Sequence, residues 1–135
     1  MEVIIEKTKI AEGLERESSL ISVNLTDNSG VSMYDRVFID NDAILAGAVS
    51  EAVSTLTKDM QLFVRGYNEN RNSYVWDLDK IPFGISDDIL NYIVCHTMNE
   101  WSIKALKKND NSFAGRATVS LQNIARKLYF KSRPD

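Results

Sequence analysis

The residues best suited to chemistry lie on one predicted helix, between Ser86 and Lys108. His96 is the only histidine of the chain and Cys95 the only cysteine. A base beside a nucleophile is what covalent or acid–base catalysis needs. Neighbouring residues of a helix point in different directions, so Cys95 and His96 make a poor pair, whereas His96 and Glu100 share a face and suit a local hydrogen bond. We therefore expect no catalytic residue and no enzyme.

Metal binding receives little support from the sequence. A single histidine cannot supply a pair of histidine ligands, and no cluster of His and Cys has metal-site spacing. Acidic clusters at 40–42, 77–79 and 87–88 offer the oxygen atoms that hard cations prefer, but none has the glycine and terminal glutamate of a calcium loop. The first and last suit helix caps instead. We expect no metal and no cofactor.

Charge is divided unevenly along the chain. Residues 104–135 hold eight basic against two acidic residues, a net charge of +6, and residues 1–103 hold eight against seventeen, a net charge of −9. A basic helix with interleaved aromatic residues can bind a phosphate backbone or an acidic protein, whereas a solvated basic face is the simpler interpretation. The candidate partner-contact residues lie in a predicted strand and at the C-terminal end: Tyr74, Trp76, Arg126, Lys127, Tyr129, Lys131 and Arg133.

Composition sets the broad class. The chain has 135 residues, 44% hydrophobic and 26% charged, which predicts one globular domain spanning 1–135. One cysteine excludes an internal disulfide framework. No apolar run is long enough to span a membrane, and the first residues lack the pattern of a signal peptide, so we expect synthesis in the cytoplasm. No phosphate-binding loop or nucleophile-elbow motif is present.

Hydrophobic periodicity predicts a mainly α fold, a bundle of about four helices with a small β element. The expected helices are one from Thr8, a second at 42–65 that ends near Gly66, a central one at 86–108 capped by Ser86, and a last one at 112–129. A polar linker at 24–33, a turn at 68–72, a strand at 73–79 and a frayed tail at 131–135 complete the prediction.

The predicted core is the second helix packed on the central one. Its buried residues should be Leu45, Val49, Leu56, Leu90, Val94, Met98 and Trp101. One strand cannot satisfy its own backbone, so 73–79 needs a partner, either 1–6 or 31–38 within the chain or a strand of another subunit.

Several stretches together resemble one protein family. They are the opening MEVIIEKTKIAEGLERESSLI, the step Tyr34-Asp35-Arg36-Val37, an Asp-rich helix start, the strand YVWDLD followed by IPFGISDDI, an aromatic-rich helix ending in Trp101, and a closing ARKLYFKSRP. In this order they resemble short structural (morphogenesis) proteins of prophages in gut anaerobes. The layout of helix, small strand excursion and aromatic helix is also similar to phage head–tail connector proteins.

This resemblance implies a non-enzymatic particle subunit. It would self-associate or bind other phage structural proteins such as portal and tail, first in the cytoplasm of the bacterial host and then in the virion. Expected contact elements are the linker 24–33, the strand 73–79 and the tail 126–135. The alternative is a small nucleic-acid- or protein-binding module that uses the basic C-terminal helix, without membrane association.

Overall fold

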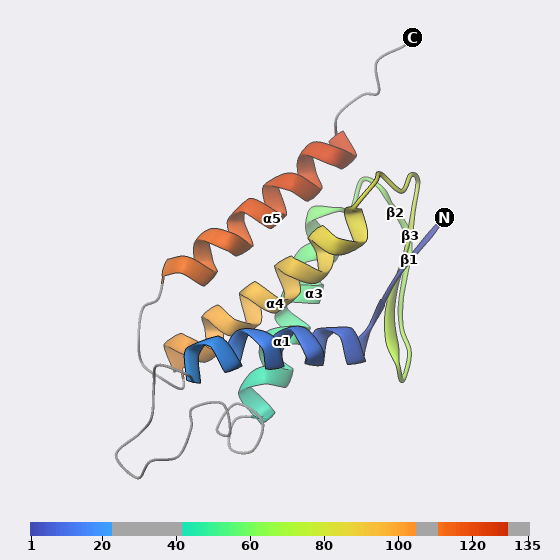
Figure 1. Cartoon of the computed structure of the whole chain (residues 1–135). Helices are drawn as coiled ribbons and strands as arrows, with labels where there is room; N and C mark the ends of the chain where they lie inside the picture. Colours follow the sequence, from blue (N-terminus) through green and yellow to red (C-terminus); the bar gives the residue numbers. More distant parts are fainter. Residues whose placement is uncertain (23–41, 105–110, 130–135) are drawn as a thin grey trace.

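The computed structural model describes residues 1–22, 42–104 and 111–129. Four helices and a three-stranded antiparallel sheet form this part of the chain (Figure 1). The predicted class, mainly α with a small β element, is therefore confirmed. The predicted linker 24–33 and tail 131–135 lie outside the described residues. The elements in chain order are β1 (Glu2–Glu6), α1 (Lys7–Ser22), α3 (Asp42–Asp59), β2 (Val64–Glu69), β3 (Ser73–Leu78), α4 (Ile85–Lys104) and α5 (Asn111–Tyr129).

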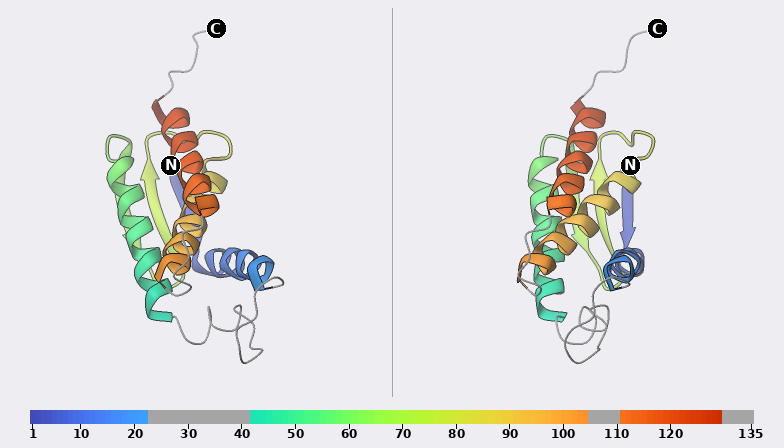
Figure 2. Two further views of the ribbon diagram at one scale, coloured as in Figure 1. Left: turned by 90° about the vertical axis from the view of Figure 1, so that its left-hand side faces the viewer. Right: turned by 60° about the vertical axis from the view of Figure 1, so that its left-hand side comes forward.

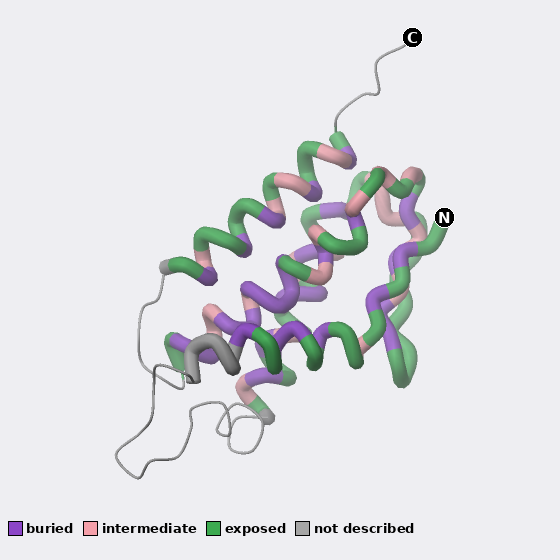
Figure 3. The backbone as a smooth tube through the Cα atoms, viewed as in Figure 1, coloured by how far each residue is buried: buried purple, intermediate pink, exposed green. Residues whose placement is uncertain are grey.

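Helix α4 occupies the centre of the molecule and contacts α1, α3, α5 and β1. Half of its residues are buried, on nearly every side of its middle turns, as the apolar sequence predicts (Figure 3). The helix begins at Ile85, after Gly84 with a positive φ of 77°, so Ser86 lies inside the first turn instead of capping it. The Ile85 amide donates to the Pro82 carbonyl oxygen at 3.2 Å, which fixes the start.

The predicted packing of α3 on α4 is confirmed. Leu45, Leu56, Val94, Met98 and Trp101 are buried in one core, while Val49 and Leu90 are partly buried against it. Helix α3 ends at Asp59, six residues earlier than predicted, and Gly66 lies in β2 instead of capping a helix.

Strand β3 is the central strand of the sheet, with β1 on one side and β2 on the other. The register pairs Val3 with Trp76 and Ile5 with Tyr74, all on the buried face of the sheet. Alternate residues therefore face the helices, as the period of two predicts. Of the predicted partners, 1–6 is confirmed as β1, and 31–38 lies outside the described residues.

Strand β2 is not predicted by the sequence, because VRGYNE does not alternate and contains a glycine. It forms because the backbone of β3 needs hydrogen-bond partners on both sides. The connection is a tight turn in which the Asn70 side-chain oxygen accepts from the amides of Asn72 and Ser73. A register shift between Val64 and Gly66 marks an irregularity near the start of β2.

Helices α1 and α5 flank α4, and Figure 2 shows α1 crossing the other helices at a steep angle. The apolar residues of α5 are spaced for one face, and the structure buries that face. Leu121 is partly buried and the others are buried: Phe113, Ala117, Ile124 and Leu128. Arg116 of α5 donates two hydrogen bonds to Glu17 of α1, at 2.8 and 3.0 Å, so an ion pair links the two outer helices.

Helix α1 approaches α4 closely at Gly13. A Cβ atom at this position would lie 2.7 Å from Cγ2 of Val94, a stiff β-branched side chain. We expect Gly13→Ala to lower the free energy of unfolding by about 1–3 kcal/mol, because overpacking outweighs the gain in helix propensity. Gly47 of α3 is the matched control, since a Cβ atom added there would meet nothing within 4 Å. Gly47→Ala should raise stability by roughly 0.5–1 kcal/mol in the same denaturant titration.

Candidate assembly surface

The two strand residues chosen from the sequence as partner contacts lie in the core. Trp76 is 0% and Tyr74 6% exposed, and the Trp76 ring N–H donates to the Thr57 hydroxyl of α3 at 2.8 Å. Their strand is hydrogen-bonded on both sides within the chain, so 73–79 does not need a strand of another subunit as its partner. The outer edges of the sheet belong to β1 and β2.

The C-terminal candidates that the structure describes contact their own chain. Lys127 Nζ lies 2.5 Å from a carboxylate oxygen of Asp88 in α4, and Arg126 donates to the Asn123 side chain. The Tyr129 ring packs edge-on against Phe63, with centroids 4.7 Å apart. Lys131 and Arg133 lie outside the described residues. Much of the basic character of α5 is therefore engaged within the fold.

Exposed hydrophobic side chains gather at one end of the molecule. This end contains the N-terminus, the α3–β2 and β3–α4 connections and the last turn of α5 (Figure 1). Backbone hydrogen bonds hold it together, because the amides of Leu78 and Asp79 donate to the carbonyls of Met1 and Phe63. We call it the apolar end and define it by five exposed residues: Met1, Leu62, Ile81, Phe83 and Tyr129.

Phe83 is the most exposed residue of the apolar end, at 99%. It lies between Pro82, whose φ is fixed by its ring, and Gly84, whose positive φ favours glycine. These two residues restrict the backbone of the turn in which the Phe83 ring lies exposed. The sequence places a large apolar side chain between proline and glycine, a pattern that indicates a turn without giving the direction of the ring.

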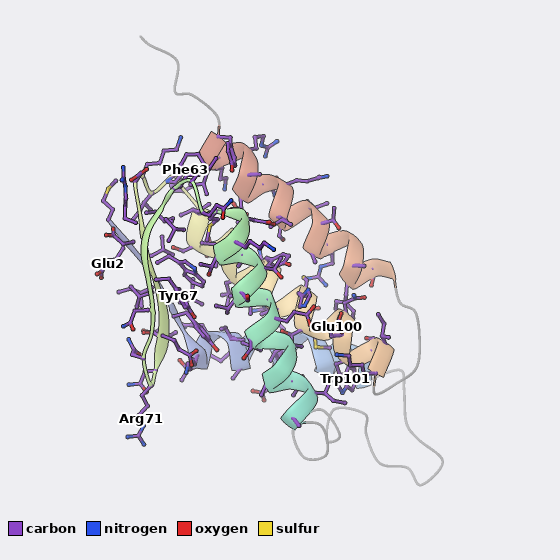
Figure 4. The ribbon with its side chains drawn as sticks, turned by 180° about the vertical axis from the view of Figure 1, so that it is seen from behind. Glu2, Phe63, Tyr67, Arg71, Glu100 and Trp101 are labelled. Carbon is purple, nitrogen blue, oxygen red and sulfur yellow. The ribbon has the colours of Figure 1, made fainter. Side chains whose placement is uncertain are left out.

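A groove runs between α3 and the inner side of β2 and has a volume of about 460 Å³. Tyr67 lies at this position, between the β2–β3 hairpin and α3 (Figure 4). The rings of Tyr67 and Tyr74 lie 5.6 and 6.3 Å from the Trp76 ring, which gives the groove an aromatic floor. We call it the α3–β2 groove and define it by its lining residues: Ser50, Val53, Ser54, Thr57, Lys58, Gln61, Tyr67, Glu69 and Tyr74.

The two tyrosines of the groove floor are uncharged. Burial, with a smaller contribution from the Glu69 carboxylate, raises the pKa of both Tyr67 and Tyr74, so the phenols stay protonated at neutral pH. Lys7 donates to Glu69 at 2.8 Å, and this hydrogen bond raises the pKa of the lysine. The charged pair lies at one end of the groove, and the floor offers apolar surface with two hydroxyl groups.

The candidate nucleophile and base lie on different sides of α4. Cys95 lines a cavity against α5, together with Arg116, whereas His96 lies 3.4 Å from Glu51 of α3. Burial raises the pKa of the Cys95 thiol, which disfavours the reactive thiolate. This geometry agrees with the separation expected from their adjacency in the helix.

Among the described residues, no helix is long and apolar enough to cross a membrane. Comparison of the chain with protein-family models, curated proteins and solved structures finds no match in any of the three.

Proposed function

We propose that this protein is a non-enzymatic structural subunit of a phage or prophage particle, at a head–tail connector or neck position. It acts by binding further copies of itself and neighbouring structural proteins such as portal or tail. The observation that carries the proposal is Phe83, a 99% exposed aromatic residue at the apolar end. Exposed apolar residues that gather at one end of a folded protein commonly mark an interaction site.

The α3–β2 groove of a second copy is the proposed docking site for Phe83. Its volume of about 460 Å³ exceeds the roughly 150 Å³ of a cavity that holds a benzene ring. Its aromatic floor suits an aromatic side chain, because such pairs attract beyond their area burial. Phe83 does not line the groove of its own chain, so contact requires a different copy.

A contact between two different surfaces is heterologous, and its repetition builds a ring when the rotation closes. Ring formation matches the connector role that the sequence resemblance implies. The exposed edge strand β2, with five of its six residues solvent-exposed, borders the same groove and offers unpaired backbone groups to the incoming subunit.

Nucleic-acid binding through the C-terminal helix is the less supported alternative. In the described part of α5, Arg116 and Lys127 are paired with Glu17 and Asp88, so neither is free to neutralise a phosphate. A protein partner therefore accounts better for the surface of the described residues.

Sedimentation velocity over a range of concentrations tests the proposal. The unmodified protein should form larger species as its concentration rises, and Phe83→Ser should shift this association at least tenfold toward higher concentration. The fold should survive, because Phe83 makes almost no contact within its own chain.

Val119 provides the control, as an exposed apolar residue of α5 away from the apolar end. Val119→Ser should leave association unchanged. A protein that stays monomeric at every concentration, alone and with the neighbouring particle proteins, would refute the proposal. So would equal association of the Phe83→Ser and unmodified proteins.

A further inference from the structure

We propose that Glu51, His96 and Glu100 form a zinc-binding site that joins α3 to α4. One ligand atom from each residue, an imidazole nitrogen or a carboxylate oxygen, lies within 4.8 Å of the other two. The sequence indicated that His96 and Glu100 share a face of α4, one turn apart. It gave no sign that Glu51, 45 positions away from His96, completes the cluster from α3.

The imidazole of His96 is the central observation. Its Nε2 atom is inaccessible to solvent and has no hydrogen-bond partner among the described residues. Buried polar nitrogen atoms are nearly always satisfied, so an unsatisfied one calls for an explanation. The His96 side chain is only 16% exposed, and the Tyr92 ring lies beside it with centroids 5.8 Å apart. The nitrogen is therefore held in place toward α3.

The distance to Glu51 fits joint metal ligation. Nε2 of His96 lies 3.4 Å from Oε1 of Glu51, without the geometry of a hydrogen bond. Tetrahedral zinc with ligand bonds near 2.1 Å separates neighbouring ligand atoms by about 3.4 Å. The Glu51 side chain is half exposed, so its carboxylate is free to rotate toward an ion held by His96.

The ligand set also fits the charge and chemistry of zinc. A neutral imidazole suits zinc, and carboxylates supply negatively charged oxygen ligands to a divalent cation. Lys104 Nζ lies 3.2 Å from Oε2 of Glu100, and Oε1 of that carboxylate remains for the metal. A water molecule would fill the fourth position, since Glu51 leaves the site open to solvent. Bound zinc would clamp α3, which forms one wall of the α3–β2 groove, to the central helix.

Titration of the full, untagged chain with zinc chloride tests the site by isothermal calorimetry. We expect one ion per chain and a melting temperature that rises with zinc concentration. Cobalt(II) in place of zinc should give the visible absorption of a tetrahedral N/O site. His96→Ala should weaken zinc binding at least tenfold, and because no other imidazole exists in the chain, the loss can be assigned to this residue.

Glu51→Gln is the second variant, because Glu51 is exposed and its substitution leaves the core untouched. It should also weaken binding at least tenfold, whereas Glu12→Gln on the exposed face of α1 should not. Cys95→Ala, which removes the only thiol, should bind zinc normally. The site is refuted if zinc fails to bind at millimolar concentration, or if His96→Ala and Glu51→Gln bind it as the unmodified chain does. None of these results depends on self-association through Phe83.

Discussion

Replacement of Trp76 by alanine is expected to lower the free energy of unfolding by about 3–5 kcal/mol, the usual cost of removing a large core aromatic. Trp76 is fully buried, contacts the rings of Tyr67 and Tyr74, and donates a hydrogen bond to Thr57. The variant loses the packing between the sheet and α3 together with that bond. Chemical denaturation followed by circular dichroism measures the change.

Trp101→Ala serves as the comparison, because Trp101 is equally buried in the core but lies on α4, away from the sheet. We expect Trp101→Ala to lower the free energy of unfolding by a similar amount. Trp76→Phe separates the two contributions, since it keeps most of the packing and removes the bond to Thr57, at a cost of about 1–3 kcal/mol. Near-normal stability of Trp76→Ala would contradict the core position and restore Trp76 as a surface contact.

Replacement of Arg116 by methionine is expected to destabilise the protein by about 1–3 kcal/mol at pH 7. Glu17 is only 7% exposed and accepts both of its charge-assisted hydrogen bonds from Arg116. The variant keeps most of the aliphatic stem but leaves a carboxylate without its partner. Arg126→Met is the matched control, because Arg126 is exposed and bonds only to Asn123, and it should change stability by less than about 0.5 kcal/mol.

Lowering the pH should remove the difference in free energy of unfolding between the unmodified protein and Arg116→Met. The hydrogen bonds from Arg116 hold the pKa of Glu17 below its ordinary value. A carboxyl group with a lowered pKa in the folded state stabilises the fold above its unfolded pKa, about 4.3. That contribution is lost as pH falls further, through the folded value. Denaturation curves at pH 7 and at successively lower pH below 4 should therefore converge. A difference that stays constant would show that the ion pair does not stabilise the fold.

The helices and their buried faces were predictable because each carries enough apolar residues at regular spacing. In α5, five apolar residues repeat every three or four positions: Phe113, Ala117, Leu121, Ile124 and Leu128. Leu121 is partly buried and the other four are buried. Strand β3 was likewise visible through the alternation of Tyr74, Trp76 and Leu78. Local patterns of this kind predict local secondary structure.

The features that the sequence did not predict depend on contacts between segments far apart in the chain. Strand β2 has no alternating pattern and exists because β3 requires a second hydrogen-bonded neighbour. Tyr74 and Trp76 are buried because their face of the sheet packs against the helices, with Trp76 bonded to Thr57 of α3, and the strand sequence does not encode that packing. The approach of Glu51 to His96 depends on how α3 crosses α4, and no spacing within either helix encodes it. The outward position of Phe83 likewise follows from the tertiary placement of its turn.

A mixing experiment tests the contact between Phe83 and the α3–β2 groove most directly. Phe83→Ser removes the aromatic side chain but keeps the groove. Ser54→Trp fills the groove from an exposed position of its lining but keeps Phe83. At a concentration where the unmodified protein has just associated, each variant alone should be monomeric by sedimentation velocity, with Glu12→Trp on the exposed face of α1 as the control that still associates. Mixed at equal concentration, the two variants should form a one-to-one heterodimer. Phe83 of the Ser54→Trp variant can then bind the intact groove of the Phe83→Ser variant. A mixture that sediments as monomers, while the unmodified protein associates, would contradict a head-to-tail contact between Phe83 and the α3–β2 groove.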